Sequence, residues 1–145
     1  MTARAWTIVV VILALVGSAT PPAYAALGAL AAGLREVMEN NLAAYDRGDV
    51  DGTMRTIDTR SPDYASTQTA VAQQVKDLGA KAALVDFAYM GHDDEFAVAR
   101  AKVKTTGKPG TGFTDNTVDA LLVFHQENGV WKLWTEQVLG VQVAP

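Results

Sequence analysis

The chain has no cysteine in its 145 residues, which excludes disulfides, thiolate metal sites and a lipid-modified N-terminal cysteine. Histidine is almost as scarce, because His92 and His125 are the only two in the sequence, too few for a closed zinc site. Acidic residues outnumber basic ones, and the formal net charge is −4. This balance lacks the basic footprint that binding to nucleic acid or anionic lipid requires. We therefore expect no metal, no cofactor and no nucleic-acid partner.

The one long apolar run stands at the N-terminus and is typical of an export signal. Arg4 precedes the run "TIVVVILALVG", and small residues ending in Ala23-Tyr24-Ala25 follow it. This is the order of a secretory signal peptide, and the run is well short of the ~20 residues that span a bilayer. We expect a signal peptide at 1–25, cleaved after Ala25, and a secreted or periplasmic domain at 26–145 with no membrane span. An uncleaved N-terminal membrane anchor is the alternative.

The first half of the domain has helical periodicity. Apolar residues from Leu27 to Tyr45 recur at steps of three and four, and Gly48 stands where this helix would end. Asp49 is placed to cap a short second helix, and Ser66 a third helix that ends at Gly79. We therefore expect three helices in succession.

The second half alternates with the period of strands. Four such segments occupy residues 81–90, 95–106, 117–126 and 130–142, and Asn128-Gly129 between the last two is a strong hairpin signal. Short connections between strands favour an antiparallel meander. The predicted fold class is α+β, with three N-terminal helices packed on a strongly curved antiparallel sheet of about four main strands.

The acidic stretch "DVDG" between the first two helices resembles part of a calcium-binding loop. With Gly52 at the sixth position of an EF-hand, however, Arg47 takes the first position, where the ion needs an oxygen ligand. A turn between helices explains the same residues, because Gly48 ends one helix while Asp49 and Asp51 stand at the positive end of the next. We interpret the stretch as a turn.

The order of these features resembles a known superfamily. A long helix ending in an aromatic residue, then "RGDVDGTM", "SPDY", a third helix and a late strand reading "NGVWKLW" resemble the NTF2-like superfamily, particularly its SnoaL-like members. The resemblance runs from about Leu30 to Val141. It implies a cone in which a curved sheet wraps around helices, with a pocket at the wide end, and a homodimer formed through the sheet.

The resemblance does not settle the chemistry, because this superfamily contains isomerases, cyclases, dehydratases and members without known activity. Where its ketosteroid isomerases carry a tyrosine on the first helix, this chain has Asn41. Their catalytic aspartate has its nearest counterpart in Asp58 or Asp63, and neither stands in a matching motif. These departures argue against an isomerase of that type.

Acidic residues that interrupt apolar strands are candidates for catalysis. A carboxylate of Asp86, Asp119 or Glu136 that was desolvated in a cone would have a raised pKa and could act as general acid or base. Asp119 and Glu136 are explained equally well as polar residues on the outward face of a strand, where side chains alternate between two faces. Asp86 instead shares a predicted face with Leu84 and Met90. His125 is either a proton shuttle beside a carboxylate or a residue at the rim. The expected pocket lining comprises Tyr45, Tyr64, Asp86, Phe87, Phe124, Trp134 and Glu136.

The function expected from these residues is an exported protein with a pocket for a small apolar ligand, acting as a non-enzymatic binding or accessory module. Two alternatives stay open. One is a small lyase or isomerase that uses Asp86 or Asp119 as general acid or base, and the other is a structural dimer that binds a partner protein.

Overall fold

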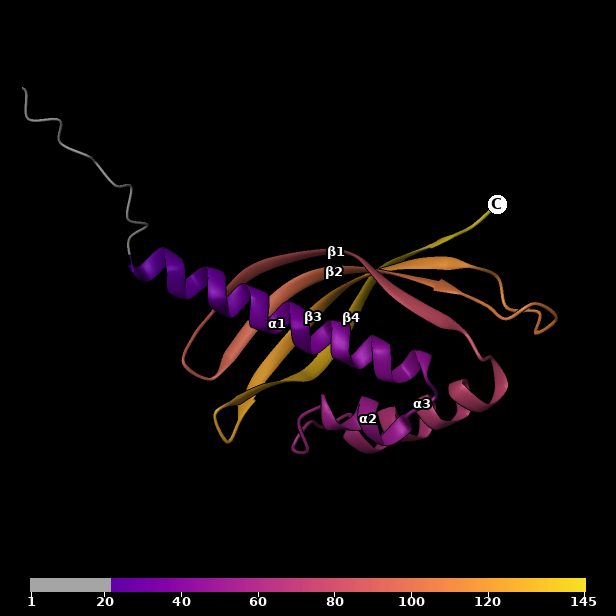
Figure 1. Ribbon diagram of the computed structural model, residues 1–145, viewed down its shortest axis with the longest axis horizontal. Helices are drawn as coiled ribbons and strands as arrows, with labels where there is room; N and C mark the ends of the chain where they lie inside the picture. Colours follow the sequence, from indigo (N-terminus) through magenta and orange to yellow (C-terminus); the bar gives the residue numbers. More distant parts are fainter. Residues whose placement is uncertain (1–21) are drawn as a thin grey trace, which may run out of the picture.

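The computed structural model describes residues 22–145, so most of the predicted signal peptide lies outside the described residues. Seven elements follow one another: α1 (Pro22–Asp46), α2 (Val50–Arg55), α3 (Tyr64–Asp77), β1 (Lys81–His92), β2 (Phe96–Thr106), β3 (Asn116–Glu127) and β4 (Val130–Val143). This is the predicted order of three helices and then four strands (Figure 1).

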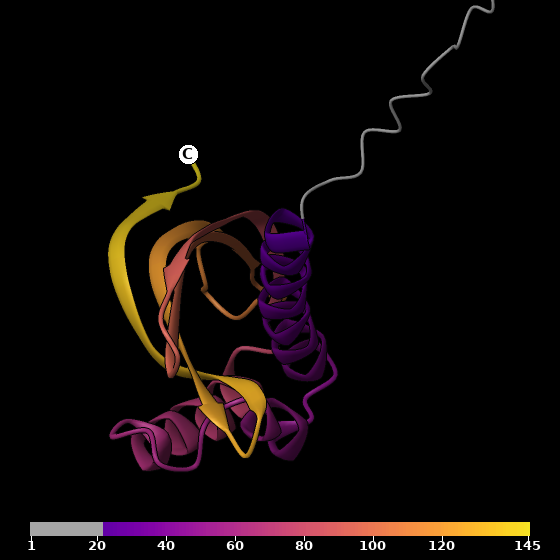
Figure 2. The same cartoon turned by 90° about the vertical axis from the view of Figure 1, so that its left-hand side faces the viewer.

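The strands form one antiparallel sheet in the order β1-β2-β3-β4, as the short connections predict. Viewed end-on, the sheet is strongly curved, with α1 on the side toward which it curves and α2 and α3 across one end (Figure 2). Asn128 and Gly129 connect β3 to β4 with φ angles of 53° and 79°, the left-handed backbone of a tight hairpin turn. The α+β cone fold is therefore confirmed.

The hydrophobic core lies between α1 and the concave face of the sheet. Leu34, Met38 and Leu42 recur on one side of α1 and are buried against this face. The strands contribute mostly small residues at the middle of the sheet, with larger ones beside them: Ala97, Ala99, Ala101, Ala120, Leu122 and Phe124. The small alanines leave room under the arch of the sheet for the long side chains of α1.

The turn between α1 and α2 is built as its residues predict. Gly48 has a φ of 71°, which favours glycine, and ends α1. Asp49 is the N-cap of α2, and its Oδ1 accepts the N–H of Gly52 at 2.7 Å. The acidic stretch is thus a helix cap and a turn.

The start of α3 differs from the prediction. The helix begins at Tyr64, two residues before Ser66, and Asp63 takes the cap position without a side-chain bond to the helix. Ser66 instead donates its hydroxyl to the carbonyl of Asp63 at 2.9 Å. The predicted cap was wrong because Ser66 bonds backward from within the first turn, an alternative open to serine at this position.

The pairing of the strands has four one-residue shifts, and two of them decide which faces of the sheet Asp86 and Glu136 occupy. In β1, the pairing with β2 shifts between Leu84 and Asp86, which leaves Val85 as an extra residue. In β4, the pairing with β3 shifts between Leu133 and Thr135, which leaves Trp134 as an extra residue. Each bulge reverses the alternation of the residues that follow it.

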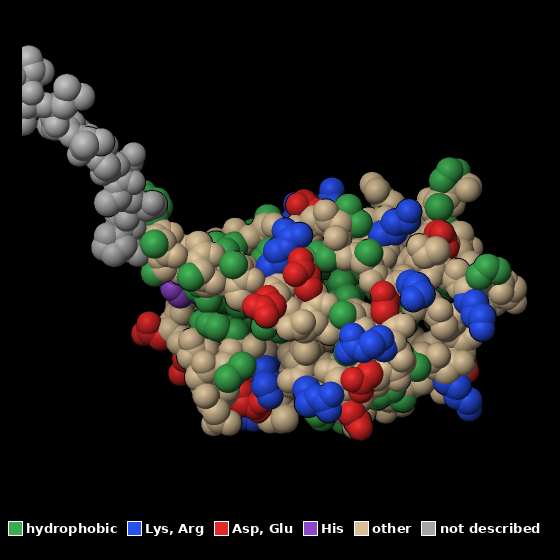
Figure 3. All heavy atoms as spheres, in the orientation of Figure 1, with side chains coloured by type: hydrophobic (Ala, Val, Ile, Leu, Met, Phe, Trp, Pro, Cys, Tyr) green, Lys and Arg blue, Asp and Glu red, His purple; other side chains and the backbone are tan. Residues whose placement is uncertain are grey.

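No helix within residues 22–145 is both long and apolar enough to cross a membrane. The face that carries the helices shows Lys and Arg side chains interspersed with Asp and Glu (Figure 3). Because positive and negative side chains are mixed, the electrostatic potential over that face is not of one sign.

Candidate functional site

A cavity of about 400 Å³ lies between the helices and the concave face of the sheet. Its size is that of small-molecule sites, which run from ~300 to 1,000 Å³. The wall comes from all three helices and all four strands, and most of it is apolar: Met38, Leu42, Val71, Leu78, Ala82, Val103, Phe113, Val118 and Leu133 among others. A few polar side chains interrupt this wall: Asn41, Thr53, Thr67, Gln74, Thr105, Asn116 and Glu136.

Glu136 is the one charged side chain among the described residues that line this cavity. Solvent reaches the Glu136 side chain because the cavity is open, so a large part of its surface is exposed. Other residues of the cavity wall nevertheless lie around the carboxylate and displace part of its water. This partial loss of water raises the pKa of the Glu136 carboxyl above its ordinary value. The cavity thus holds a single carboxylate in an environment that disfavours its charge.

The bulge at Trp134 places Glu136 inside the cone. Leu133 pairs with Phe124 on the concave face, and strict alternation from it would send Glu136 to the convex face. With Trp134 as the extra residue, Glu136 instead pairs with Leu122, which is buried in the core. Glu136 reaches the cavity only because of this irregularity.

Two other polar residues of α1 face the same cavity. Asn41 donates its amide to Thr56 Oγ1 at 2.7 Å, and this bond ties α1 to the end of α2. Tyr45 lies one turn further along, and burial, with a smaller effect from Asp46, raises the pKa of its hydroxyl. Tyr45 therefore keeps its proton at neutral pH and is able to donate a hydrogen bond.

The structure brings two of the predicted lining residues, Tyr45 and Glu136, to this cavity. Phe87 and Phe124 pack edge-to-face in the core beside it, with ring centroids 6.5 Å apart. Trp134 borders a neighbouring hollow between α3 and β4, and Tyr64 borders a separate surface depression near α2. The predicted lining is thus divided among several places.

Asp86 and Asp119 lie on the convex face, away from the cavity. The bulge at Val85 pairs Asp86 with Lys102, so Asp86 does not share a face with Leu84 and is exposed. Asp119 accepts two hydrogen bonds from Arg100, at 2.8 and 2.6 Å, and these bonds lower its pKa. The expectation that either carboxylate is desolvated inside the cone was wrong, because the bulge and the ion pair place both outside.

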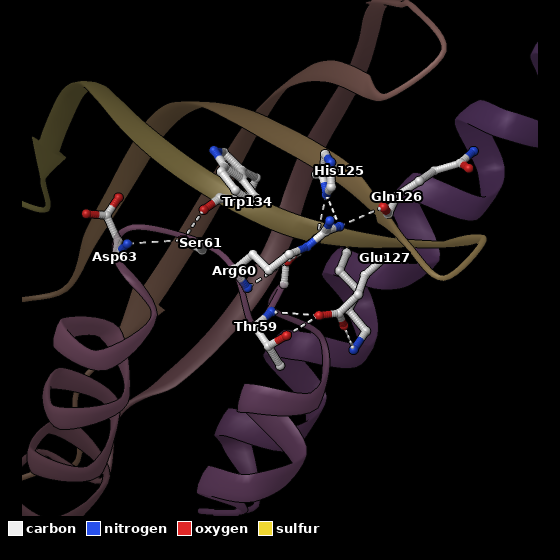
Figure 4. Close-up of polar contacts among 10 residues, drawn as sticks. Thr59, Arg60, Ser61, Asp63, His125, Gln126, Glu127 and Trp134 are labelled. Carbon is white, nitrogen blue, oxygen red and sulfur yellow. Dashed lines mark hydrogen bonds and ion pairs between the residues drawn. The ribbon is translucent and has the colours of Figure 1, made fainter.

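A second polar centre joins the segment after α2 to the sheet (Figure 4). Nδ1 of His125 lies 2.6 Å from Oδ2 of Asp58, and both residues are buried. Arg60 donates its backbone N–H to Asp58 Oδ1 at 2.8 Å and its guanidinium to the carbonyl of Gln126 at 3.1 Å. Burial tends to raise the pKa of Asp58, but the bonds from His125 and Arg60 outweigh it and hold that pKa below its ordinary value.

The His125 ring is closed in by aromatic neighbours. Its centroid lies 4.7 Å from that of Phe96 and 4.9 Å from that of Trp134. His125 is therefore a buried residue, and the prediction of a position at the rim was wrong. Neither His125 nor Asp58 lines the main cavity.

Main-chain bonds complete this attachment of the 56–63 loop to β4. Asp58 donates its N–H to the carbonyl of Leu133 at 2.8 Å, and Leu133 returns its N–H to Thr56 at 2.9 Å. Ser61 donates its hydroxyl to the carbonyl of Trp134 at 2.6 Å. The geometry indicates a fastening of loop to sheet rather than a site open to substrate.

The sequence also carries a family signature. Residues 36–143, from the middle of α1 to the end of β4, match the family described as "Anti-sigma-I factor RsgI9, C-terminal domain". No curated protein shows significant sequence similarity to the chain.

Several solved structures share the fold. A function-unknown protein from Mycobacterium tuberculosis superposes with a TM-score of 0.68 at 10% identity, covering 88% of this chain and 78% of that one. A proposed scytalone dehydratase from Novosphingobium aromaticivorans gives 0.65 at 9%, with coverages of 85% and 92%. An NTF-2 like protein of unknown function from Shewanella oneidensis gives 0.58 at 11%, with coverages of 73% and 95%. At these identities the likeness shows the fold alone, which is an α+β cone of the NTF2-like type.

Proposed function

Since the chain belongs to the family of the anti-sigma-I factor RsgI9 C-terminal domain, we propose that it is a non-enzymatic module that binds a small, largely apolar ligand in its cone. The family takes its name from a domain of an anti-sigma factor, which is a regulatory protein. Such a context favours ligand binding or an accessory role over catalysis.

The observation that carries this proposal is the cavity. A space of about 400 Å³ remains open between α1, α3 and the sheet, beside a core of buried residues. Apolar walls with a few polar groups are the usual make-up of a small-molecule site. A purely structural module would gain stability by filling this space.

We also propose that the module acts outside the cytoplasm. The order of charge, apolar run and small residues in 1–25 supports export. Removal of that segment would leave eleven basic and sixteen acidic residues, a net charge of −5, which suits a soluble domain without affinity for anionic surfaces.

The first experiment is to purify the protein from its host and record its mass under native conditions. Extra mass that disappears on denaturation supports the proposal and identifies the ligand. If the native protein carries no extra mass, binding of the neutral dye Nile red tests the cavity directly. Failure to bind the dye as well would contradict the proposal.

A matched pair of substitutions on β2 locates the dye. Thr105 lines the cavity, whereas its neighbour Lys104 is exposed on the convex face. Thr105→Trp puts a large side chain into the cavity and should weaken dye binding about tenfold or more, by removing buried apolar contact. Lys104→Trp should leave the affinity unchanged. Equal effects of the two substitutions would place the dye elsewhere.

A second candidate function is a small lyase or isomerase whose acid–base group is Glu136 instead of Asp86 or Asp119. Asp86 and Asp119 are outside the cone, but Glu136 and Tyr45 line the same cavity. The raised pKa of Glu136 and the retained proton of Tyr45 provide one acid–base group and one donor. Turnover of the co-purified ligand by the wild type, and its loss in Glu136→Gln, would favour this candidate.

The third candidate, a structural dimer, is supported by apolar residues along the second half of β4. Val138, Leu139, Val141 and Val143 are each about half exposed or more, between 47% and 63%. Apolar patches of this kind often mark contacts with another chain. Light scattering after size exclusion tests it, because Val141→Lys should convert a dimer to a monomer while Val130→Lys, at the start of the strand, should not.

A further inference from the structure

Glu136 differs from the other acidic residues of β3 and β4 because no cation within residues 22–145 pairs with it. Asp119 pairs with Arg100 at 2.6 Å, and Glu127 with Lys132 at 2.5 Å. Among residues 22–145, the Glu136 carboxylate takes part in no ion pair or hydrogen bond. The cavity walls formed by those residues contain no Lys, Arg or His that could reach it.

An unpaired carboxylate in such a space selects among ligands. A second negative charge would be repelled, because the cavity offers no counter-ion and the surrounding protein screens charge less than water does. A cation or a strong hydrogen-bond donor would gain a charge-assisted bond with the carboxylate. The rest of the wall is mostly apolar, so the remainder of the ligand must be apolar as well.

We propose that the cavity takes an apolar amine, whose ammonium group pairs with Glu136 while its hydrocarbon body lies against Leu42, Val103 and Val118. This proposal rests on the proposed function and names the ligand class for the same cavity. The ammonium supplies the cation that the described residues do not, and the apolar walls bury the hydrocarbon chain.

Three ligands of equal chain length separate the contributions of head group and chain. Calorimetric titration of the full protein purified from its host uses n-octylamine, n-octanol and n-octanoate, each at neutral pH. We expect the amine to bind about tenfold more tightly than the alcohol, the gain of one charge-assisted bond, and the carboxylate to bind weakest.

Glu136→Gln keeps the size of the side chain and removes its charge, so the amine should bind that variant no better than the alcohol. The control is Asp86→Asn, which removes the same unit of charge from the exposed convex face and should leave the preference for the amine intact. The control separates the local carboxylate from the net charge of the protein.

The outcomes distinguish this inference from the proposed function. If none of the three ligands binds although Nile red does, the amine assignment is overturned and the proposed function stands, whereas failure of the dye as well contradicts both. If amine and alcohol bind the wild type equally, or the carboxylate binds best, the cavity is a binding site but the amine assignment is overturned. If Asp86→Asn abolishes the preference as fully as Glu136→Gln, general electrostatics explains it and the pairing with Glu136 is refuted.

Discussion

Nδ1 of His125 lies 2.6 Å from Oδ2 of Asp58, although the two residues are 67 positions apart in the chain. One belongs to the loop after α2 and the other to the end of β3, so the bond ties the helical half of the molecule to the sheet. At this distance it has the length of a charge-assisted hydrogen bond. Neither residue of the pair lines the cavity.

Asp58→Ala should therefore destabilise the fold. It leaves the buried Nδ1 of His125 and the Arg60 backbone N–H without their acceptor, at a cost of about 3 kcal/mol in the free energy of unfolding. Urea unfolding followed by circular dichroism measures it. Asp119→Asn, which breaks an ion pair on the convex face, serves as the control and should have a far smaller effect. An equally small effect of Asp58→Ala would show that the pair does not fasten the loop.

The same aspartate should make the protein sensitive to acid. Its pKa is lower in the folded state than in the unfolded chain, so its contribution is present above the unfolded pKa and is lost as pH falls through the folded one. The free energy of unfolding of the wild type should therefore fall below about pH 4. Asp58→Asn should lose less over that interval, and parallel pH profiles for the two proteins would contradict this.

Glu136 should have the opposite dependence on pH. Its pKa is raised in the folded state, so its favourable contribution at low pH is lost as pH rises from the unfolded pKa through the folded one. Glu136→Gln should match the wild type near pH 3 and be slightly more stable at pH 7, by about 0.5 kcal/mol or less because solvent reaches the side chain. A loss of stability at pH 7 would mean that Glu136 makes a bond that favours folding.

Two glycines of the helical half should respond in opposite directions to alanine. Gly48 has a φ of 71°, and an added Cβ would lie 3.3 Å from Val75 Cγ1, so Gly48→Ala should cost about 1 kcal/mol or more. Gly33 lies within α1 with open space around it, so Gly33→Ala should stabilise the helix by up to about 1 kcal/mol. Thermal unfolding of both variants tests the pair, and a stabilising Gly48→Ala would show that the turn relaxes.

The periodicity of the sequence was sufficient to predict the fold. Apolar steps of three and four in α1, alternation in the strands and the Asn128-Gly129 turn are local signals, and each stands where the corresponding element forms. Such signals depend on a few neighbouring residues, and tertiary packing did not override them here.

The site was harder to predict because its geometry depends on pairing between strands. The bulges at Val85 and Trp134 reverse the faces of Asp86 and Glu136, and nothing in simple alternation announces an extra residue. The bond between Asp58 and His125 joins residues too distant in sequence for a local pattern to link them. The one signal in the sequence was His125 itself, which follows an apolar run in β3. A search for an acid that could pair with this histidine would have been the way to predict the bond.

The attachment of the 56–63 loop also determines which part of β4 another strand can pair with. β4 is an edge strand, and free backbone groups on an edge invite another chain to pair with them. The loop occupies that edge at Leu133, where Thr56 and Asp58 take up the backbone N–H and C=O. Beyond Glu136 the edge reads "QVLGVQV" and carries no charged side chain to discourage pairing. On the β4 edge, pairing with another chain is therefore restricted to residues 137–143, while the part of the strand next to the loop is closed to it.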